Sequence, residues 1–431
     1  QKTAYEMLRS LVGSEMCIRD RLNPQGYVVY PPPLGKTDTG GQIVYILELG
    51  KALAKKGIKV DIFTRAFELY QKEEEQIFPN LKIIRIPCGP NKFVAKEKLY
   101  ELMPEFTENI MKYIEKRRKK YDLIHSHYWD GGYAGIILSK MLDIPHVHTP
   151  HTLGKAKKLE VEIEEAPTEK LKPYYRFHVR IAIEQKIYNK VDAILVICET
   201  TRIQLLHYYL VDFEKIYVVY PGVDLETFNP KKNKFDNQIN LKNNSILTMS
   251  RLVPAKGIDR LIEALNFIKE KINFHFYIGG ETNLEASNSK EEINYKKYLL
   301  NIIKKYKMEQ KITFIGQLNH EKVAAYYRNT NIFVNPARYE PFGLTTMESM
   351  ACGTAPLISH VAGSKEIIID GLNGFIINSH DRKLLGSQIL RLLSDKKMLK
   401  RISENAAFTI KEHYSWDKIS EKIISLYNKI T

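Results

Sequence analysis

Apolar runs typical of buried strands alternate with longer helical segments twice along this 431-residue chain, and no other feature limits the fold as strongly. Alternation of strands and helices favours a parallel sheet covered by helices, because each parallel connection needs a crossover segment. The repetition of the pattern predicts two such sheets in tandem. We therefore expect an α/β protein with two doubly wound, Rossmann-like domains.

The first set of elements ends at Pro221 and Gly222, a dipeptide that marks a turn and a domain boundary. Its predicted strands lie at residues 59–63, 82–86, 123–126, 146–149, 193–198 and 216–219. Its predicted helices lie at residues 43–56, 96–119, 132–141, 173–190 and 200–209.

The second set repeats the alternation and is followed by one more helix, at residues 415–430. Predicted strands lie at residues 245–249, 275–278, 311–314, 332–334, 355–358 and 374–376. Predicted helices include residues 257–268, 293–305, 321–329 and 381–394. We expect domains at 22–222 and 223–412, with a terminal segment at 413–431.

Residues 1–21 resemble a translated sequencing-library adapter joined to its transposon end. We exclude such a segment from fold reasoning and expect it to make few native contacts. The native chain would then enter at Leu22, in the middle of the first strand. Most of that strand is expected to be missing or replaced by residues 16–21.

The chain carries a formal net charge of +15, of which residues 1–21 contribute only +1. A basic chain is compatible with nucleic acid, membranes or small anionic substrates, and an AT-rich genome also raises the lysine content. Cys88, Cys198 and Cys352 lack metal-type spacing, which favours a reducing cytoplasm. No apolar run approaches the ~20 residues of a membrane span.

The stretch at residues 335–353, NPARYEPFGLTTMESMACG, points to a ligand. It follows a predicted strand, and a helix is expected from about Phe342, with Gly343 beside its first turn. A helix N-terminus binds anions through its unpaired amides. Glu340 and Glu348 would repel a phosphate, so they are better suited to hydroxyl groups. An anionic, hydroxyl-rich ligand fits both features, which indicates a nucleotide diphosphate sugar.

Two cations lie on the loop after the predicted strand 245–249, at Arg251 and Lys256. The carboxyl end of a parallel strand is where such sheets bind ligands. Fixed positive charges there would neutralise the charge that builds on a leaving diphosphate.

Glycines at positions 40 and 41 follow a proline-rich loop and precede a helix, which would let the backbone approach a phosphate. Motifs of other nucleotide-binding classes are missing, since the sequence has no GxxxxGK[ST] and no GxGxxG after a strand. Residues 22–431 also have no Asp-x-Asp motif and no Cys/His cluster, so we expect no metal and no cofactor.

The two glutamates seven residues apart, between an apolar strand and a small-residue helix, resemble the signature of retaining family-four glycosyltransferases. The strings GYVVYPPPLGKTDTGGQ, RIPCGPNKFVAK, HSHYWDGGYAG and HTPHTLG narrow the resemblance to the mannosylfructose-phosphate synthase and sucrose-phosphate synthase types. The resemblance covers residues 22–416. It implies the GT-B fold, in which two Rossmann-like domains face a cleft and a C-terminal helix returns to the first domain.

The resemblance also implies roles on the donor side. Arg251 and Lys256 would clamp the donor phosphates, Glu348 would bind the ribose, and Glu340 would bind the transferred sugar. The amides around Phe342, Gly343 and Leu344, together with Gly41, would assist. His151 would contact the donor sugar and shape the reaction face without acting as a nucleophile.

On the acceptor side, the resemblance implies that Lys96 and Arg180 hold fructose 6-phosphate, with help from Arg176, Gly40 and Gln42. Glu184 lies one helical turn after Arg180 and could orient its guanidinium. The domain at 22–222 would thus bind the acceptor, and the domain at 223–412 would bind the donor.

The leading interpretation is therefore a cytoplasmic enzyme that moves a hexose from GDP-mannose or UDP-glucose to fructose 6-phosphate. A second interpretation is an interfacial glycosyltransferase with a lipid acceptor, because the run KRRKK could lie on an anionic membrane. A third is a non-catalytic protein that binds sugar nucleotides or nucleic acid, supported only by the basic charge. The sequence predicts no nucleic-acid partner and no stable membrane insertion, and it leaves the oligomeric state open.

Overall fold

The computed structural model describes residues 18–22, 28–31, 40–66, 68, 70–92, 94–163, 176–280 and 290–431. By its contacts the chain divides into two compact units. The first unit contains Gln1–Pro32, Gln42–Tyr220 and Ile419–Thr431, and the second contains Pro33–Gly41 and Pro221–Lys418. Both units are α/β layers, as the alternation of elements predicts.

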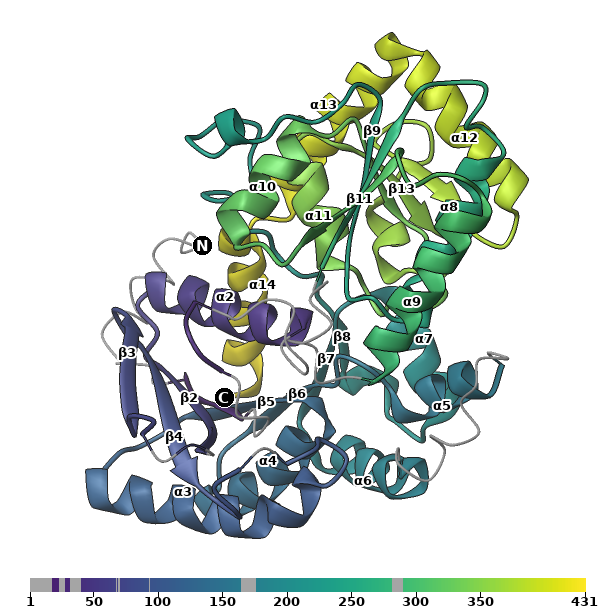
Figure 1. Cartoon of the computed structure of the whole chain (residues 1–431). Coiled ribbons are helices and arrows are strands. Elements are labelled where there is room, and N and C mark those ends of the chain that lie inside the picture. Colours follow the sequence, from purple (N-terminus) through teal and green to yellow (C-terminus); the bar gives the residue numbers. More distant parts are fainter. Residues whose placement is uncertain are drawn as a thin grey trace. The chain divides into compact units, whose positions relative to one another are not determined.

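The first unit is built on an eight-stranded sheet with the order β3-β4-β2-β1-β5-β6-β7-β8 (Figure 1). Only β3 runs antiparallel to its neighbour. The strands are β1 (Ile18–Leu22), β2 (Val60–Ala66), β3 (Glu74–Phe78), β4 (Leu81–Pro87), β5 (Leu123–His127), β6 (His146–Thr149), β7 (Ala193–Val196) and β8 (Ile216–Val218). The strand order reverses between β1 and β5, which is where an open α/β sheet places its ligand crevice.

Helices cover both faces of this sheet, with α2 and α14 on one face and α3 and α4 on the other (Figure 1). The helices of the unit are α2 (Gly41–Lys55), α3 (Met103–Arg117), α4 (Tyr128–Leu142), α5 (Gly154–Ile163), α6 (Phe177–Lys190) and α7 (Glu199–Tyr208). The terminal helix α14 (Trp416–Ile430) joins the unit from Ile419 onward. Lys56 forms an ion pair of 2.6 Å with Glu421 of α14.

The second unit has a six-stranded, fully parallel sheet with the order β11-β10-β9-β12-β13-β14. Its strands are β9 (Ser245–Met249), β10 (His275–Gly279), β11 (Ile312–Gly316), β12 (Ile332–Asn335), β13 (Ala355–Ser359) and β14 (Phe375–Ile377). The order reverses between β9 and β12, so the ligand edge of this sheet lies at their carboxyl ends.

Two groups of helices enclose the second sheet, with α8 and α12 on one side and α10 and α11 on the other (Figure 1). The helices are α8 (Ile258–Asn266), α9 (Lys290–Lys305), α10 (His320–Asn329), α11 (Leu344–Ala351), α12 (Arg382–Ser394) and α13 (Lys396–His413). Buried Ile, Leu and Phe side chains of α8, α9 and α12 meet those of the strands in one continuous core.

Several predicted boundaries need correction. The helix expected at 96–119 is instead a 3-10 turn, η1 (Leu99–Leu102), followed by α3. Arg118 is the C-cap of α3 and has a left-handed φ of 50°. The helix expected at 132–141 begins at Tyr128. The helix expected from Phe342 begins at Leu344, because Gly343 has a φ of 100° and acts as its N-cap. The strand β3 and the helices α5 and α13 were not predicted.

The expectation that residues 1–21 make few contacts is wrong for Ile18–Arg21. These residues belong to β1, which lies between β2 and β5 and pairs in parallel with both. A strand in the middle of a sheet contributes both edges of its backbone to hydrogen bonding. We also expected residues 16–21 to replace the missing part of the first strand. From Ile18 onward the observed pairing of β1 agrees with that expectation. Residues 1–17 lie outside the described part.

Within the described part, no helix has the length and apolar character that crossing a membrane would require.

Candidate active site

The loops that follow β9 and β12 lie against each other at the ligand edge of the second sheet. The Arg338 amide donates a hydrogen bond of 2.8 Å to the Ala255 carbonyl. Gly257 has a φ of 64°, and a Cβ atom built on it would lie 2.2 Å from the Pro336 carbonyl oxygen. Only glycine fits here, because it tolerates positive φ and leaves room for the neighbouring backbone. The close approach brings the predicted cations and carboxylates into one place.

Lys256 and Glu340 form an ion pair across these two loops, with 2.5 Å between Nζ and Oε2. Their side chains are 18% and 15% exposed, so the pair is largely shielded from water. Arg251 lies on the same loop as Lys256 but is more exposed, and it lies 3.9 Å from the Glu292 carboxylate. The loop after β9 therefore carries one cation held by Glu340 and one that extends towards solvent.

The N-terminus of α11 is held close to this pair. A Cβ atom on Gly343 would lie 3.1 Å from Glu340 Cγ and from Asn335 Nδ2. The amides of Gly363 and Ser364 donate to the carbonyls of Glu340 and Phe342, at 3.0 and 2.8 Å. The turn before α11 is thus fixed by the loop after β13, and the N-terminus of α11, a kind of position that attracts anions, lies beside the Glu340 side chain.

Glu348 lies on α11, half-buried, and accepts a hydrogen bond of 3.4 Å from the Tyr327 hydroxyl. Burial, with the Glu348 carboxylate as the next cause, raises the pKa of Tyr327 well above its usual value. Tyr327 therefore stays a neutral donor that keeps Glu348 in position.

Sequence reasoning missed three residues that build this site. Arg338 binds Asp259 through two bonds, of 2.7 and 2.6 Å, and donates a third, of 2.7 Å, to the Pro254 carbonyl. Burial raises the pKa of Asp259, but the hydrogen bonds and the positive charge of Arg338, together with the hydrogen bond from Tyr295, lower the pKa overall. The Asn335 Nδ2 group is buried beside Gly343, where it has no hydrogen-bond partner among the described residues. Arg338 and Asn335 lie inside the stretch 335–353, so the position of that stretch was the only sequence signal that could have pointed to them.

In the first unit, His151 follows β6 with a left-handed φ of 58° and is buried. Its Nε2 atom lies 3.0 Å from Nδ1 of His127, at the end of β5. The rings of Tyr45 and His151 pack edge to face, with 5.1 Å between their centroids. A non-glycine residue in this conformation is strained, and such strain gathers at functional positions.

Arg180 is buried on α6 and is surrounded by acceptors. It donates to Glu184 at 2.8 Å, to the Tyr128 hydroxyl at 3.0 Å, and to the Thr152 carbonyl and hydroxyl at 2.8 and 3.0 Å. Four of the five N–H groups of a guanidinium are therefore used within the protein. Burial lowers the pKa of Arg180, but the Glu184 carboxylate, which is 1% exposed, together with Tyr128 and Tyr209, raises the pKa overall, so the charge is kept.

Tyr128 lies within electrostatic range of both Arg180 and Lys96. Burial raises the pKa of Tyr128, whereas the positive charges of Arg180 and Lys96 lower it, so both cations act on one phenol. The Arg180 guanidinium also lies over the Tyr128 ring, 4.8 Å from its centroid. Arg180 thus contacts Tyr128, a residue that the sequence did not single out, and the charge of Lys96 acts on the same phenol.

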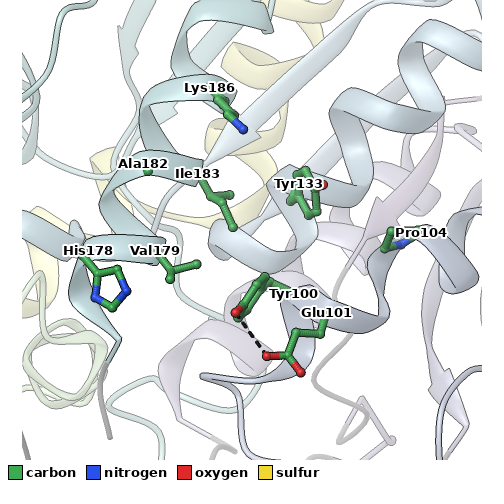
Figure 2. A pocket seen from close by; sticks show the side chains of 9 residues that line it. All are labelled: Tyr100, Glu101, Pro104, Tyr133, His178, Val179, Ala182, Ile183 and Lys186. Carbon is green, nitrogen blue, oxygen red and sulfur yellow. Dashed lines mark hydrogen bonds between the residues drawn. The ribbon is translucent and has the colours of Figure 1, made fainter. Parts of the chain in front are cut away.

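Arg176 has other partners. It precedes α6 with a left-handed φ of 44° and donates to the Tyr100 hydroxyl at 2.8 Å and to Glu101 at 2.5 Å. Figure 2 shows Tyr100 and Glu101 at one side of a hollow of about 500 Å³ between η1, α4 and α6. Tyr133, Ile183 and Lys186 line the rest. Arg176 therefore ties the start of α6 to η1.

Gly40, Gly41 and Gln42 lie at the start of α2, where Gly41 is the first helical residue. Gly41 groups with the second unit, and a Cβ atom on it would lie 3.2 Å from Leu344 Cδ1. Glycine at this position leaves room for the Leu344 side chain. Residues 32–39 of the proline-rich loop lie outside the described part.

Two family models match consecutive parts of the chain. Residues 39–227 match the family described as Glycosyltransferase Family 4, and residues 229–409 match Glycosyl transferases group 1. These matches cover the residues discussed above on both sheets.

Relatives of similar length extend the match over nearly the whole chain. Mannosylfructose-phosphate synthase of Agrobacterium fabrum is 33% identical over 94% of this chain and 90% of its own. D-inositol 3-phosphate glycosyltransferase of Corynebacterium efficiens is 31% identical, with 92% of each chain covered. Probable sucrose-phosphate synthase of Thermosipho melanesiensis is 30% identical, with 91% of each covered.

A solved structure of sucrose-phosphate synthase from Thermosynechococcus elongatus has a TM-score of 0.84 and 27% identity, covering 96% of this chain and 98% of its own. Anabaena HepE in complex with UDP and glucose has a TM-score of 0.72 at 17% identity, over 96% and 100% of the two chains, and supports the fold alone. The predicted GT-B fold and the predicted family are confirmed by these matches. The chain belongs to glycosyltransferase family 4 and is an enzyme with the GT-B fold.

Proposed function

We propose that this enzyme transfers a hexose from a nucleotide sugar to fructose 6-phosphate and retains the configuration at the anomeric carbon. The observation that carries the proposal is the Lys256–Glu340 pair at the ligand edge of the second sheet, beside the N-terminus of α11. Few ligands need a cation, free helix amides and carboxylates together. A nucleoside diphosphate sugar does, because its phosphates are anionic and its sugars carry hydroxyls.

On this proposal, Lys256, Arg251 and the first amides of α11 bind the diphosphate. Glu348, held by Tyr327, binds the ribose hydroxyls, and Glu340 binds hydroxyls of the hexose. Asn335, with a buried NH₂ group beside Gly343, adds a donor near the same end of the helix.

In the reaction, the acceptor hydroxyl oxygen forms a bond to the anomeric carbon on the face from which the diphosphate leaves. The bond between that carbon and the phosphate oxygen breaks, and the leaving phosphate takes the acceptor proton. The protein supplies positioning and positive charge, since fixed charges stabilise the diphosphate as its charge grows. The step uses no protein nucleophile and no metal.

A phosphorylated acceptor is supported by the buried cation Arg180 and by Lys96 near the same tyrosine. The relatives' names agree, since they refer to mannosylfructose phosphate, D-inositol 3-phosphate and sucrose phosphate. Inositol 3-phosphate is therefore a second candidate acceptor, and these names favour it over a lipid.

The lipid-acceptor alternative has less support, because two cations of the basic run at the end of α3 are engaged in ion pairs. Arg117 lies 3.0 Å from Glu74, and Lys119 pairs with Asp61. Cations held by carboxylates of β2 and β3 are less available to an anionic membrane. We retain a cytoplasmic location as part of the proposal.

Product analysis tests the proposal. The protein is incubated with UDP-glucose or GDP-mannose, each combined with fructose 6-phosphate, inositol 3-phosphate or free fructose, and the products are identified by mass spectrometry and NMR. We expect a phosphorylated disaccharide from fructose 6-phosphate with one donor. Preferential transfer to inositol 3-phosphate would make that compound the acceptor in place of fructose 6-phosphate. Transfer to free fructose alone, or to none of the three acceptors, would overturn the proposal.

A further inference from the structure

Histidines of β5 and β6 form separate hydrogen-bond networks on the two faces of the first sheet. On the face towards α4, the Ser126 hydroxyl lies 2.6 Å from His146 Nε2 and 2.8 Å from His148 Nδ1. Gly132 and Gly135 of α4 lie against these two rings, since a Cβ atom on either would clash with them. This network fills the core between the sheet and α4.

The network on the other face reaches His151. The Nδ1 atom of His127 lies 3.0 Å from Nε2 of His151, and the two ring planes differ by 35°. Two facing imidazole nitrogens at this distance need one proton between them, because two lone pairs repel and two protons clash. The tautomer of one ring therefore fixes the tautomer of the other.

A second layer supports this pair. His125 lies against His127, with ring centroids 4.4 Å apart. Both nitrogens of His125 are engaged, with Tyr427 Oη at 2.6 Å from Nδ1 and Thr149 Oγ1 at 2.8 Å from Nε2. Thr149 precedes His151 by two residues. Tyr427 of α14 thus holds His125. His125 in turn contacts His127, the partner of His151, and Thr149, at the end of the strand that leads to His151.

We propose that His127 is a positioning residue that fixes the ring orientation and tautomer of His151, with His125 and Tyr427 supporting it from behind. The inference rests on the proposed function and on the role that the family resemblance implies for His151, which is contact with the donor sugar. An apolar residue would fill the position of His127 equally well if packing were its only task. The hydrogen bond instead makes one ring nitrogen of His151 a defined donor or acceptor, as hydrogen-bonded partners do for catalytic histidines.

The test uses three variants of the full-length protein. His127→Phe keeps a ring but removes the hydrogen bond, whereas His127→Asn keeps a polar group near the position of Nδ1. His148→Asn is the matched control, because it removes a buried histidine from the opposite face of the same sheet. Circular dichroism and the melting temperature establish which variants fold.

The first readout is the tautomer of His151, from the ring nitrogen shifts of ¹⁵N-histidine-labelled protein, with His151 assigned through His151→Gln. We expect one tautomer in the wild type, His127→Asn and His148→Asn, and mixed tautomers in His127→Phe. Unchanged His151 signals in folded His127→Phe would overturn the inference. If His127→Phe does not fold, Tyr427→Phe takes its place in the experiment. Unchanged ring signals of both His125 and His151 in Tyr427→Phe would also overturn the inference.

The second readout is steady-state kinetics with the productive substrate pair. Loss of one such hydrogen bond should lower kcat about five- to tenfold in His127→Phe with little change in the donor KM. His127→Asn should recover most of this loss, and His148→Asn should keep the wild-type kcat. Equal losses in His127→Phe and His148→Asn would show a structural role only. The NMR readout needs no turnover, so failure of the proposed function and failure of this inference are distinguishable.

Discussion

Lys256 Nζ lies 2.5 Å from Glu340 Oε2, so the cation proposed for the donor phosphates and the carboxylate proposed for the donor sugar form one pair. Each side chain limits where the other can lie. A diphosphate that binds Lys256 must share this cation with Glu340, which keeps the ammonium at the junction of phosphate and sugar. On the proposed function, the pair therefore links stabilisation of the diphosphate charge to positioning of the sugar.

The first prediction is that Lys256→Ala lowers kcat more than it raises the donor KM. Charge on the diphosphate grows in the transition state, so a contact with it contributes mainly to kcat. Losing one fixed electrostatic contact costs roughly 2.7–4 kcal/mol in comparable sites. Steady-state kinetics with varied donor concentration measures this. Lys400→Ala, an exposed lysine of the same unit, serves as the control, and an unchanged kcat in Lys256→Ala would remove Lys256 from the mechanism.

The pairing of Lys256 with Glu340 was beyond what the sequence could show. The motif stretch and the loop after β9 placed both residues at strand ends, because parallel strands collect their carboxyl ends at one edge. That β9 and β12 are neighbours depends on the reversal of strand order, which local patterns do not encode. The Arg338–Asp259 contact was missed for the same reason.

Gly257 gives a second prediction. Alanine at φ 64° costs about 1–2 kcal/mol, and here its Cβ would also lie 2.2 Å from the Pro336 carbonyl oxygen. Relieving that overlap must move the loops after β9 and β12 apart, at a further cost of about 1–3 kcal/mol. We expect Gly257→Ala to lower both the melting temperature and kcat.

The matched control for Gly257 is Gly371→Ala in the same unit. Gly371 has a φ of 73°, but the nearest heavy atom to its Cβ position is 4.0 Å away. Gly371→Ala should therefore show only the backbone cost and keep kcat. Equal effects of the two substitutions would mean that close packing of the two loops does not matter.

A third prediction concerns pH. Burial lowers the pKa of His146 to about 3, and burial with the nearby His146 and His151 lowers the pKa of His148 well below its usual value. In the unfolded chain both titrate near 6.5. The unfolded state therefore binds more protons below about pH 6.5, and the stability present above that pH is lost as the pH falls towards 3. Each histidine adds about 1.4 kcal/mol per pH unit to this slope.

Urea unfolding between pH 7.5 and 5 measures the slope. Trp129 is buried in the first unit, and replacing the only other tryptophan, Trp416, with Phe makes its fluorescence specific for that unit. His146→Asn should reduce the pH dependence of the unfolding free energy by the contribution of one histidine. His413→Asn, at an exposed position, should leave this pH dependence unchanged. Equal slopes in wild type and His146→Asn would contradict the prediction.

The limits of fold prediction are clearest in the first unit. Periodicity located β5 and β6 but did not show that alternate histidines on them face α4 or α14. The need for Gly132 and Gly135 in α4 is explained only by the structure, in which the His148 and His146 rings pack against them. The segment Ile18–Leu22 carries no apolar alternation, yet it forms a central strand, because pairing on both edges depends on backbone groups rather than on side chains.

The fourth prediction is that activity survives chelation. The described residues contain no group of three or more His, Cys, Asp or Glu side chains that could hold a metal ion, and Lys256 and Arg251 supply positive charge where a metal would otherwise act. Initial rates with and without excess EDTA measure this. Complete loss in EDTA, restored by one divalent ion, would show that a metal completes the phosphate site.

The last prediction concerns the acceptor phosphate, where Arg180 cannot simply be removed. Arg180→Ala would leave the carboxylate of Glu184, which is 1% exposed, without its cation, at a cost of about 3–5 kcal/mol in stability. Arg180→Met combined with Glu184→Gln removes the pair together, and glutamine can still accept a bond from the Gly154 amide. This double variant should fold and test the phosphate contact separately from the fold.

Lys96→Ala and the Arg180→Met/Glu184→Gln double variant should each lower kcat/KM for fructose 6-phosphate more than tenfold, because a hydrogen bond to a charged group contributes about 1.5–3 kcal/mol. Free fructose lacks the phosphate, so its kcat/KM should change much less, and the ratio of the two acceptors cancels any loss of folded enzyme. Lys98→Ala, an exposed lysine two residues from Lys96, should leave the ratio unchanged. Equal losses on both acceptors would mean that Lys96 and Arg180 support the fold, and the acceptor would then be unphosphorylated.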